Sequence, residues 1–398
     1  MSFIHVSLKV LLFYFSCCLL SEDVVAKDIN SSQVLVGATQ FSQYLPLIKG
    51  KKVGLVVNQT SRVFEQHLVD FLITKNVDVT LIFSPEHGFR GDRDAGEKFS
   101  STVDSQTGIP LISLYGKQRK PSLKTMANLD VVIFDIQDVG VRFYTYISTM
   151  HYVMESAAEA GVKVIILDRP NPNGAFIDGP VLDLRFKSFV GMHPIPLLHG
   201  LTVAELAKMI VGEGWLVSQK KLDLTVIKIK NYYKNRGYTL PVKPSPNLPN
   251  AQSISLYPSL GFFEATNVSI GRGTEFPFQV IGHDNIRLGD FAFMPLSKPG
   301  FASKPKLMNR ALHGQDLRHV KVQGLDMRYI IEWHQAFASQ NKPFFVHPEF
   351  MDKLAGTDTL RKSIESGHSI QQIKQSWQTD LAMFIKKRQP YLLYSNES

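Results

Sequence analysis

Short runs of β-branched and other apolar residues alternate with helical stretches from residue 51 onward, and this alternation restricts the fold most. Strands that are buried on both faces are continuous apolar runs, and parallel strands need a crossover helix between them. Strands are predicted at 52–57, 79–83, 110–114, 130–134 and 162–167, with an alternating edge strand at 222–229. The pattern predicts an α/β fold with a Rossmann-like, mostly parallel sheet and helices on both faces.

Two helices of this region have clear ends. Residues 144–160 contain no proline and stop before Gly161, which suits a helix C-cap. The segment 202–211 opens with Thr202, and Glu205 follows three places on, which predicts a capping box. A further helix is predicted at 370–387.

The chain is longer than the roughly 250–300 residues that one hydrophobic core supports, so two domains are expected. The proline-rich segment 241–249 can be neither helix nor central strand. We place the boundary near His283, after a glycine-rich stretch typical of an active-site loop. This gives a Rossmann-like catalytic domain at 27–283 and a smaller C-terminal α+β domain at 284–398 that closes the cleft.

Residues 1–26 are predicted to be a signal peptide. The apolar run 10–20 is too short to span a bilayer, and Val24 and Ala26 are small residues at the positions that precede cleavage. We therefore expect an exported protein, periplasmic or secreted, without stable membrane insertion after cleavage. A retained N-terminal anchor is the alternative. Both cysteines, Cys17 and Cys18, lie in this segment, so a disulfide or a thiolate site is not expected in the mature chain.

The formal net charge of +9 favours an anionic polymer such as cell-wall material as a partner. Nucleic acid is disfavoured, because no lysine and arginine run is interleaved with aromatic residues.

Polar residues follow each strand of the predicted parallel sheet. Because ligands bind beyond the carboxyl ends of such strands, these residues are expected to form one site. In chain order they include Asn58, Glu86, His87, Tyr115, Asp135, Asp138, Arg142, Asn171 and Asn173.

Glu86 is the strongest catalytic candidate, since it stands at a strand end behind the rigid Pro85. A positioned carboxylic acid suits proton donation to a leaving oxygen. The alternative is that Glu86 caps the following loop. Glu275 and Asp138 are further catalytic candidates, and Glu264 or a tyrosine also stays open as the second group.

The remaining candidates would bind substrate. Tyr144 and Tyr146 offer ring faces to a sugar, although both could be core residues. Arg272 lies between two glycines and could grip a carboxylate, as could Arg142, which alternatively neutralises Asp138. Polar contacts with substrate are expected from Asn58, His87, Asn171, Asn173 and Asn247.

No cofactor is expected. Glu86, His87 and the nearby aspartates are suitable metal ligands, but their spacing matches no standard zinc arrangement. No glycine-rich phosphate loop follows the first strand and no Gly-x-Ser-x-Gly elbow occurs, which disfavours nucleotide binding and an α/β-hydrolase.

Six ordered motifs resemble the signatures of the NamZ-type exo-β-N-acetylmuramidases, glycoside hydrolase family 171, formerly a domain of unknown function. They are found at 58–60, 85–91, 135–146, 168–174, 244–249 and 271–275. The resemblance covers nearly the whole chain after residue 26. It implies a Rossmann-like domain joined to a smaller C-terminal domain, with the site in the cleft and Glu86 as a catalytic residue.

The resemblance also implies release of N-acetylmuramic acid from the non-reducing end of peptidoglycan fragments, as in cell-wall recycling. The lactyl carboxylate of this sugar would need a cation, for which Arg142 or Arg272 would serve. The alternatives are a periplasmic binding protein for muropeptides or sugars and a metal-dependent hydrolase of another wall component.

Overall fold

A seven-stranded sheet forms the larger part of the fold. The computed structural model describes residues 33–86, 88–89, 102–116 and 118–397. The sheet has the order β11-β8-β7-β1-β4-β6-β5, and its strands pair in parallel except for β5 against β6. Its strands are β1 (Lys52–Val57), β4 (Asp78–Ser84), β5 (Thr102–Val103), β6 (Pro110–Ser113), β7 (Val131–Asp135), β8 (Lys163–Leu167) and β11 (Leu224–Ile227). The six predicted strands are confirmed, with β11 at an edge.

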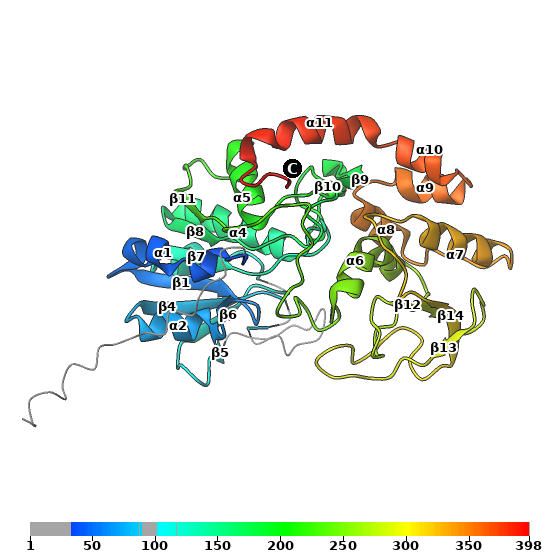
Figure 1. The fold of residues 1–398 in the computed structure, drawn as a ribbon, viewed down its shortest axis with the longest axis horizontal. Helices are drawn as coiled ribbons and strands as arrows, with labels where there is room; N and C mark the ends of the chain where they lie inside the picture. Colours follow the sequence, from blue (N-terminus) through cyan, green and yellow to red (C-terminus); the bar gives the residue numbers. More distant parts are fainter. Residues whose placement is uncertain (1–32, 87, 90–101, 117, 398) are drawn as a thin grey trace, which may run out of the picture. The chain divides into compact units, whose positions relative to one another are not determined.

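Helices cover both faces of this sheet because successive side chains of a strand point to opposite sides. In β7, Val132 and Phe134 pack into one apolar core, and Val131 and Ile133 into the other. The first core contains side chains of α3 (Leu123–Met126), α4 (Tyr146–Ala160) and α5 (Val203–Gly212). The second contains side chains of α1 (Phe41–Ile48) and α2 (Leu68–Thr74). The predicted α/β architecture is thus confirmed (Figure 1).

The predicted helix signals hold, with one exception. Gly161 ends α4 with φ of 75°, and Thr202 and Glu205 form the capping box of α5. The prediction of one helix at 370–387 is wrong, because α10 (Ile370–Gln375) and α11 (Gln378–Arg388) are separate. Trp377 lies at the break, where its buried indole donates to Asp178 Oδ1 at 3.0 Å.

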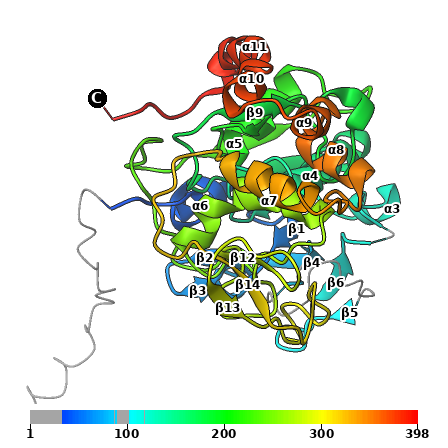
Figure 2. The same cartoon turned by 90° about the vertical axis from the view of Figure 1, so that its right-hand side faces the viewer.

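A smaller antiparallel sheet with the order β12-β14-β13 follows, as the predicted C-terminal α+β region requires (Figure 2). Its strands are β12 (Val280–His283), β13 (Phe291–Phe293) and β14 (Leu312–Asp316). Helix α6 (Ala251–Leu260) precedes the predicted boundary, and α7 (Arg328–Ala338), α8 (Pro348–Ala355) and α9 (Thr359–Glu365) follow it. β12 ends at the predicted domain boundary and pairs with β14. The boundary near His283 stays a prediction.

Two short strand pairs and four 3-10 turns complete the described elements. The strand pairs are β2 (Arg62–Val63) with β3 (Gln66–His67), and β9 (Asp178–Val181) with β10 (Pro196–Leu198). The turns are η1 (Gly37–Thr39), η2 (Leu184–Phe186), η3 (Gly261–Ala265) and η4 (Gln389–Tyr391). Within the described ranges, no helix combines the length and the apolar character needed to cross a bilayer.

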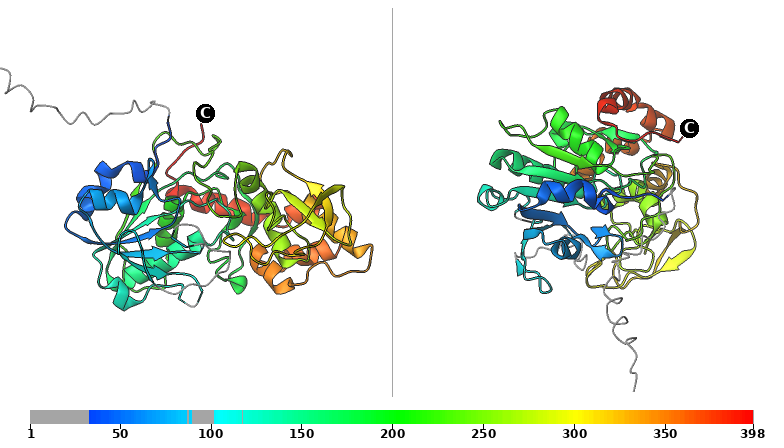
Figure 3. Two further views of the ribbon diagram at one scale, coloured as in Figure 1. Left: turned by 90° about the horizontal axis from the view of Figure 1, so that it is seen from below. Right: turned by 60° about the vertical axis from the view of Figure 1, so that its left-hand side comes forward.

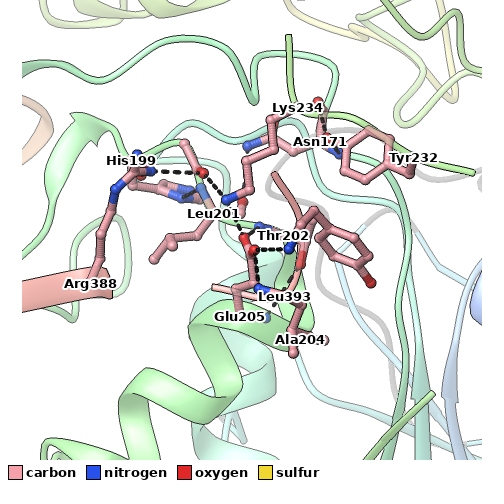
Figure 4. A network of polar contacts seen from close by, with 12 residues as sticks. Asn171, His199, Leu201, Thr202, Ala204, Glu205, Tyr232, Lys234, Arg388 and Leu393 are labelled. Carbon is pink, nitrogen blue, oxygen red and sulfur yellow. Dashed lines mark hydrogen bonds and ion pairs between the residues drawn. The ribbon is translucent and has the colours of Figure 1, made fainter. Parts of the chain in front are cut away.

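The C-terminal segment returns to the large sheet. Helix α11, red in Figures 1 and 3, packs on β9, and η4 packs on α5. Beyond it, the backbone N–H of Leu393 donates to Glu205 Oε1 at 2.8 Å, while Lys234 Nζ lies 2.5 Å from Glu205 Oε2 (Figure 4). The Tyr394 hydroxyl donates to Asp168 Oδ2 at 2.6 Å. The tail residues therefore supply partners to two fully buried carboxylates, Glu205 and Asp168.

Candidate active site

A small cavity lies at the carboxyl ends of β4 and β7, where the polar strand ends were predicted to meet. Its volume is about 80 Å³. Ligand pockets commonly have roughly 300–1,000 Å³, so a bound saccharide would extend beyond this cavity. The lining residues are Glu86, Phe143, Tyr144, Thr145, Tyr146, Ser245, Asn247, Leu248, Tyr257, Arg272 and Phe278. Residues of both the large sheet and the later part of the chain therefore build one site.

Glu86 enters the cavity directly after β4. Its Oε2 accepts a hydrogen bond of 3.0 Å from the Thr145 hydroxyl, and the Tyr146 hydroxyl lies 3.5 Å from its backbone oxygen. Burial, together with the nearby Glu86 carboxylate, raises the pKa of the Tyr115 phenol. His87, which was predicted to bind substrate, lies outside the described residues.

Tyr144 and Tyr146 line the cavity but pack against each other. Their rings meet edge to face with centroids 4.8 Å apart, and Tyr257 lies 5.9 Å from Tyr144 in a similar arrangement. The Tyr144 hydroxyl donates to the backbone oxygen of Pro244 at 2.8 Å. Burial raises the pKa of each of these phenols, so they stay neutral hydroxyls. Sugar stacking by Tyr144 and Tyr146 stays a prediction.

Arg272 reaches the same cavity from a loop between two glycines. Gly271 and Gly273 have φ of 81° and 80°, which only glycine adopts without strain. Arg272 Nε donates to Glu264 Oε1 at 2.7 Å, and the guanidinium carbon lies 4.9 Å from the Phe278 ring centroid. Among the described residues, no hydrogen bond occupies its two terminal nitrogen atoms. The edge of the guanidinium that carries these two nitrogen atoms is therefore available to an anion.

Glu264 is held in place from both sides. Burial opposes its ionisation, but Arg272 and Lys306 outweigh that effect and lower the pKa of Glu264. Lys306 Nζ also donates to the backbone oxygens of Phe263, Glu264 and Thr266 at 2.6–2.9 Å. The turn that carries Glu264 is thus fixed, and its carboxylate fixes Arg272.

Arg142 is not among the residues that line the cavity, and its role in substrate binding stays a prediction. Its guanidinium is fully buried. Nη1 donates to the backbone oxygens of Pro180 and Ile195, and Nη2 to those of Leu354 and Ala355. Because these bonds engage both terminal nitrogens, Arg142 connects segments of the fold, whereas Arg272 is among the residues that line the cavity.

Asp138 lies behind the cavity wall. Its Oδ2 accepts from the backbone N–H of Gly140 at 2.7 Å, whereas Oδ1 is buried without a hydrogen-bond partner in the described part of the chain. Burial raises the pKa of Asp138 to about 7. Since Asp138 is not among the lining residues, its catalytic role stays a prediction.

Asn171 and Asn173 also lie outside the lining of the cavity, and their role in substrate binding stays a prediction. Asn171 Nδ2 donates to the backbone oxygen of Leu201 at 2.9 Å, and Asn173 Nδ2 to that of Val139 at 2.8 Å. Both side chains are buried. These side chains provide hydrogen-bond donors for backbone oxygens next to the site.

The last three predicted residues differ in their access to the cavity. Asn247 lines it and donates to the backbone oxygen of Phe301 at 2.7 Å. Asn58 is fully buried, and its Oδ1 accepts from the backbone and the hydroxyl of Thr60. Glu275 lies outside the lining, with a side chain that is 79% exposed and paired with Lys298. The substrate role of the asparagines and the catalytic role of Glu275 stay predictions.

Comparisons with known protein families also match the chain in two successive parts. The model described as "Exo-beta-N-acetylmuramidase NamZ, N-terminal" matches residues 53–252, and the corresponding C-terminal model matches residues 255–394. The chain belongs to the NamZ family. The two matches meet after residue 252, which is earlier than the boundary predicted near His283.

Individual members of the NamZ family match over most of their length. The peptidoglycan β-N-acetylmuramidase NamZ of Bacillus subtilis strain 168 is 39% identical over 381 residues, which covers 89% of this chain and 90% of the relative. Crystal structures of two DUF1343 family proteins from Bacteroides fragilis, 45% and 29% identical, have TM-scores of 0.84 and 0.79. Each covers 92% of this chain and 100% of its own. The α/β fold is therefore shared within the NamZ family.

Sequence reasoning did not single out Thr145 and Tyr257, which line the cavity, or Lys306, which binds the turn that carries Glu264. Thr145 precedes a helix, where threonine ordinarily indicates a cap. Tyr257 stands inside α6, and Lys306 is distant in sequence from the turn that it binds. Local patterns carry no signal for such contacts.

A larger groove of about 470 Å³ lies between the strands β13 and β14 and helix α7. Two of its lining carboxylates have cationic partners, since Asp290 pairs with Arg287 at 2.8 Å and Asp316 with Arg318 at 2.6 Å. The third, Glu332, accepts a hydrogen bond from Gln315 Nε2 at 3.3 Å. The smaller cavity, which contains Glu86 and Arg272, is the candidate active site. Within the described ranges, no group of three His, Cys, Asp or Glu residues could hold a metal ion.

Proposed function

We propose that the chain is an exo-acting glycoside hydrolase that releases N-acetylmuramic acid from the non-reducing end of peptidoglycan-derived saccharides. Membership of the NamZ family supports this activity. The observation that carries it is the placement of Glu86 and Arg272 in one cavity at the strand ends. One residue would supply the proton for bond cleavage, and the other would recognise the carboxylate of the sugar.

In this proposal Glu86 is the general acid. Its protonated carboxyl group donates to the glycosidic oxygen as the bond to the anomeric carbon breaks, so the aglycone leaves as an alcohol. Water then completes hydrolysis at the anomeric carbon. Glu264 and Tyr257 are candidates for the second group, because both lie beside Arg272.

Arg272 is proposed to select the muramic acid. N-acetylmuramic acid differs from N-acetylglucosamine by a lactyl ether with a carboxylate, and a guanidinium edge binds a carboxylate through two parallel hydrogen bonds. Glu264 and Phe278 hold the guanidinium so that its terminal nitrogens stay available.

The test compares two substrates of different leaving groups, the disaccharide N-acetylmuramyl-β-1,4-N-acetylglucosamine and 4-nitrophenyl β-N-acetylmuramide. The purified protein should hydrolyse both, and Glu86→Gln should lose about 10²–10⁴-fold in kcat on the disaccharide. The loss on the nitrophenyl substrate should be smaller, since nitrophenolate leaves readily without a proton. A folded protein that binds N-acetylmuramic acid but cleaves neither substrate would instead be a binding protein.

We also propose that the protein acts outside the cytoplasm on peptidoglycan fragments. The leader-like residues 1–26 support export, and the positive charge of the chain suits an anionic wall. Cell fractionation with an antibody tests this. Protein found in the periplasm or medium with its N-terminus at Lys27 is expected, and full-length protein in the cytosol would contradict it.

A further inference from the structure

The start of helix α4 lacks the cap that its sequence offers. Thr145 occupies the N-cap position of this 15-residue helix, where a threonine oxygen usually accepts a bond from a backbone N–H of the first turn. Within the described residues, the Thr145 side chain accepts no such bond. Its hydroxyl instead donates to Glu86 Oε2 at 3.0 Å.

Other helices of the same chain show the ordinary arrangement. Thr202 accepts from the Glu205 backbone at the start of α5, and Ser369 accepts from the Gln372 backbone at the start of α10. The backbone conformation explains the difference. Thr202 and Ser369 are extended, with ψ of 169° and 157°, whereas Thr145 is helical with ψ of −3°. The helical conformation turns the hydroxyl of Thr145 away from its own helix.

We propose that Thr145 is a positioning residue that holds the Glu86 carboxyl group in the cavity, an inference that rests on the proposed function. A hydroxyl donates more strongly to a carboxylate than to a carboxylic acid. The bond therefore strengthens as Glu86 gives its proton to the leaving oxygen. The positive end of α4 favours the same charge. Thr145 at the start of α4 thus stabilises the Glu86 carboxylate as it forms, instead of capping the first turn of its own helix.

The variant Thr145→Val removes the hydroxyl and keeps the shape of the side chain, while Thr145→Ser keeps the hydroxyl. With the disaccharide substrate, Thr145→Val should lower kcat about 10- to 100-fold and leave KM within about twofold. Thr145→Ser should retain most of kcat. The loss should be smaller with the nitrophenyl substrate, because its leaving group needs little help from the acid.

Measurements of Tm and of a double variant distinguish a positioning role of Thr145 from a purely structural one. Ser369→Ala, which removes a true cap far along the chain, should lower Tm and leave kcat unchanged, whereas Thr145→Val should leave Tm unchanged. Adding Thr145→Val to Glu86→Gln should cost no further activity, since Thr145 acts through Glu86.

Two results would overturn the inference. One is a Thr145→Val protein with lowered Tm and wild-type kcat. The other is an equal loss of kcat on both substrates, which would mean that Thr145 does not act through proton donation. Inactivity of the wild-type protein on both substrates would contradict the proposed function itself and is a separate outcome.

Discussion

Arg272 is held by three neighbours at the scale of single residues. Glu264 binds one edge of the guanidinium, Phe278 lies against its face, and Lys306 fixes the turn that carries Glu264. Such preorganisation lowers the cost of binding, because the side chain has little freedom left to lose.

Replacing Arg272 should remove the preference for muramic acid. Arg272→Ala should lower kcat/KM for 4-nitrophenyl β-N-acetylmuramide about 10- to 100-fold relative to the glucosaminide, as expected for a lost bond to a charged group. Arg272→Lys should not restore the preference, because lysine lacks the planar pair of donors. An unchanged ratio of kcat/KM values in Arg272→Ala would show that another group recognises the lactyl carboxylate.

Asp138 should make stability depend on pH. Burial raises its pKa to about 7 from an ordinary value of 3.8, so the folded state binds a proton that the unfolded state has released. Its contribution to stability is complete below pH 3.8 and is lost as pH rises to about 7. Thermal unfolding of Asp138→Asn, which cannot ionise, checks this. Its Tm should rise relative to the wild type between pH 5 and pH 8, and a constant difference would contradict the assignment.

Sequence reasoning selected Glu86 and Arg272, which the structure places in one cavity, but it did not predict the backbone contacts made by other selected residues. Arg142, Asn171 and Asn173 stand in the same polar segments, yet they donate to backbone oxygens inside the fold. Loops at strand ends need such donors to satisfy their own buried carbonyl groups. A polar residue at a strand end can therefore contact a ligand or satisfy buried backbone groups. Which of the two occurs depends on segments distant in sequence, such as Leu354 and Ala355 for Arg142.

At the scale of elements, the strands of the large sheet could be predicted well because burial on both faces leaves an uninterrupted apolar run. β1 agrees with its prediction at both ends, and β7 is shifted by one residue. The break between α10 and α11 could not be predicted, since it depends on a contact between Trp377 and Asp178, about two hundred positions earlier. Local periodicity does not include such contacts.

Gly161 gives a prediction for one element, the C-terminal end of α4. It has φ of 75° and no heavy atom within 4 Å of an added Cβ, so a substitution there changes backbone strain without a clash. Gly161→Ala should destabilise the protein by about 1–2 kcal/mol, seen as a lower Tm or denaturant midpoint. Gly237→Ala is the matched control, because Gly237 is equally unobstructed and has no positive φ. Equal effects of the two variants would exclude the left-handed conformation as the cause.

For the whole molecule, the C-terminal tail is part of the core network around α5. Without residues 392–398, Glu205 Oε1 loses its two backbone donors and Asp168 loses the Tyr394 hydroxyl. An unsatisfied buried acceptor costs about 1–3 kcal/mol, so the truncated protein should unfold several degrees lower. Tyr394→Phe keeps the backbone donors and should show a smaller loss of Tm. A truncated protein with wild-type Tm would mean that water replaces the tail.

The position of these partners in the chain has a consequence for biosynthesis. Asp168 and Glu205 lie near the middle of the sequence, whereas their donors Tyr394 and Leu393 follow 226 and 188 positions later. A nascent chain that does not yet include Leu393 and Tyr394 can form the large sheet, but it carries these carboxylates without those donors. Native stability is therefore reached only once this late segment is made and packed, and quality-control proteases can distinguish a chain truncated before it from the intact protein.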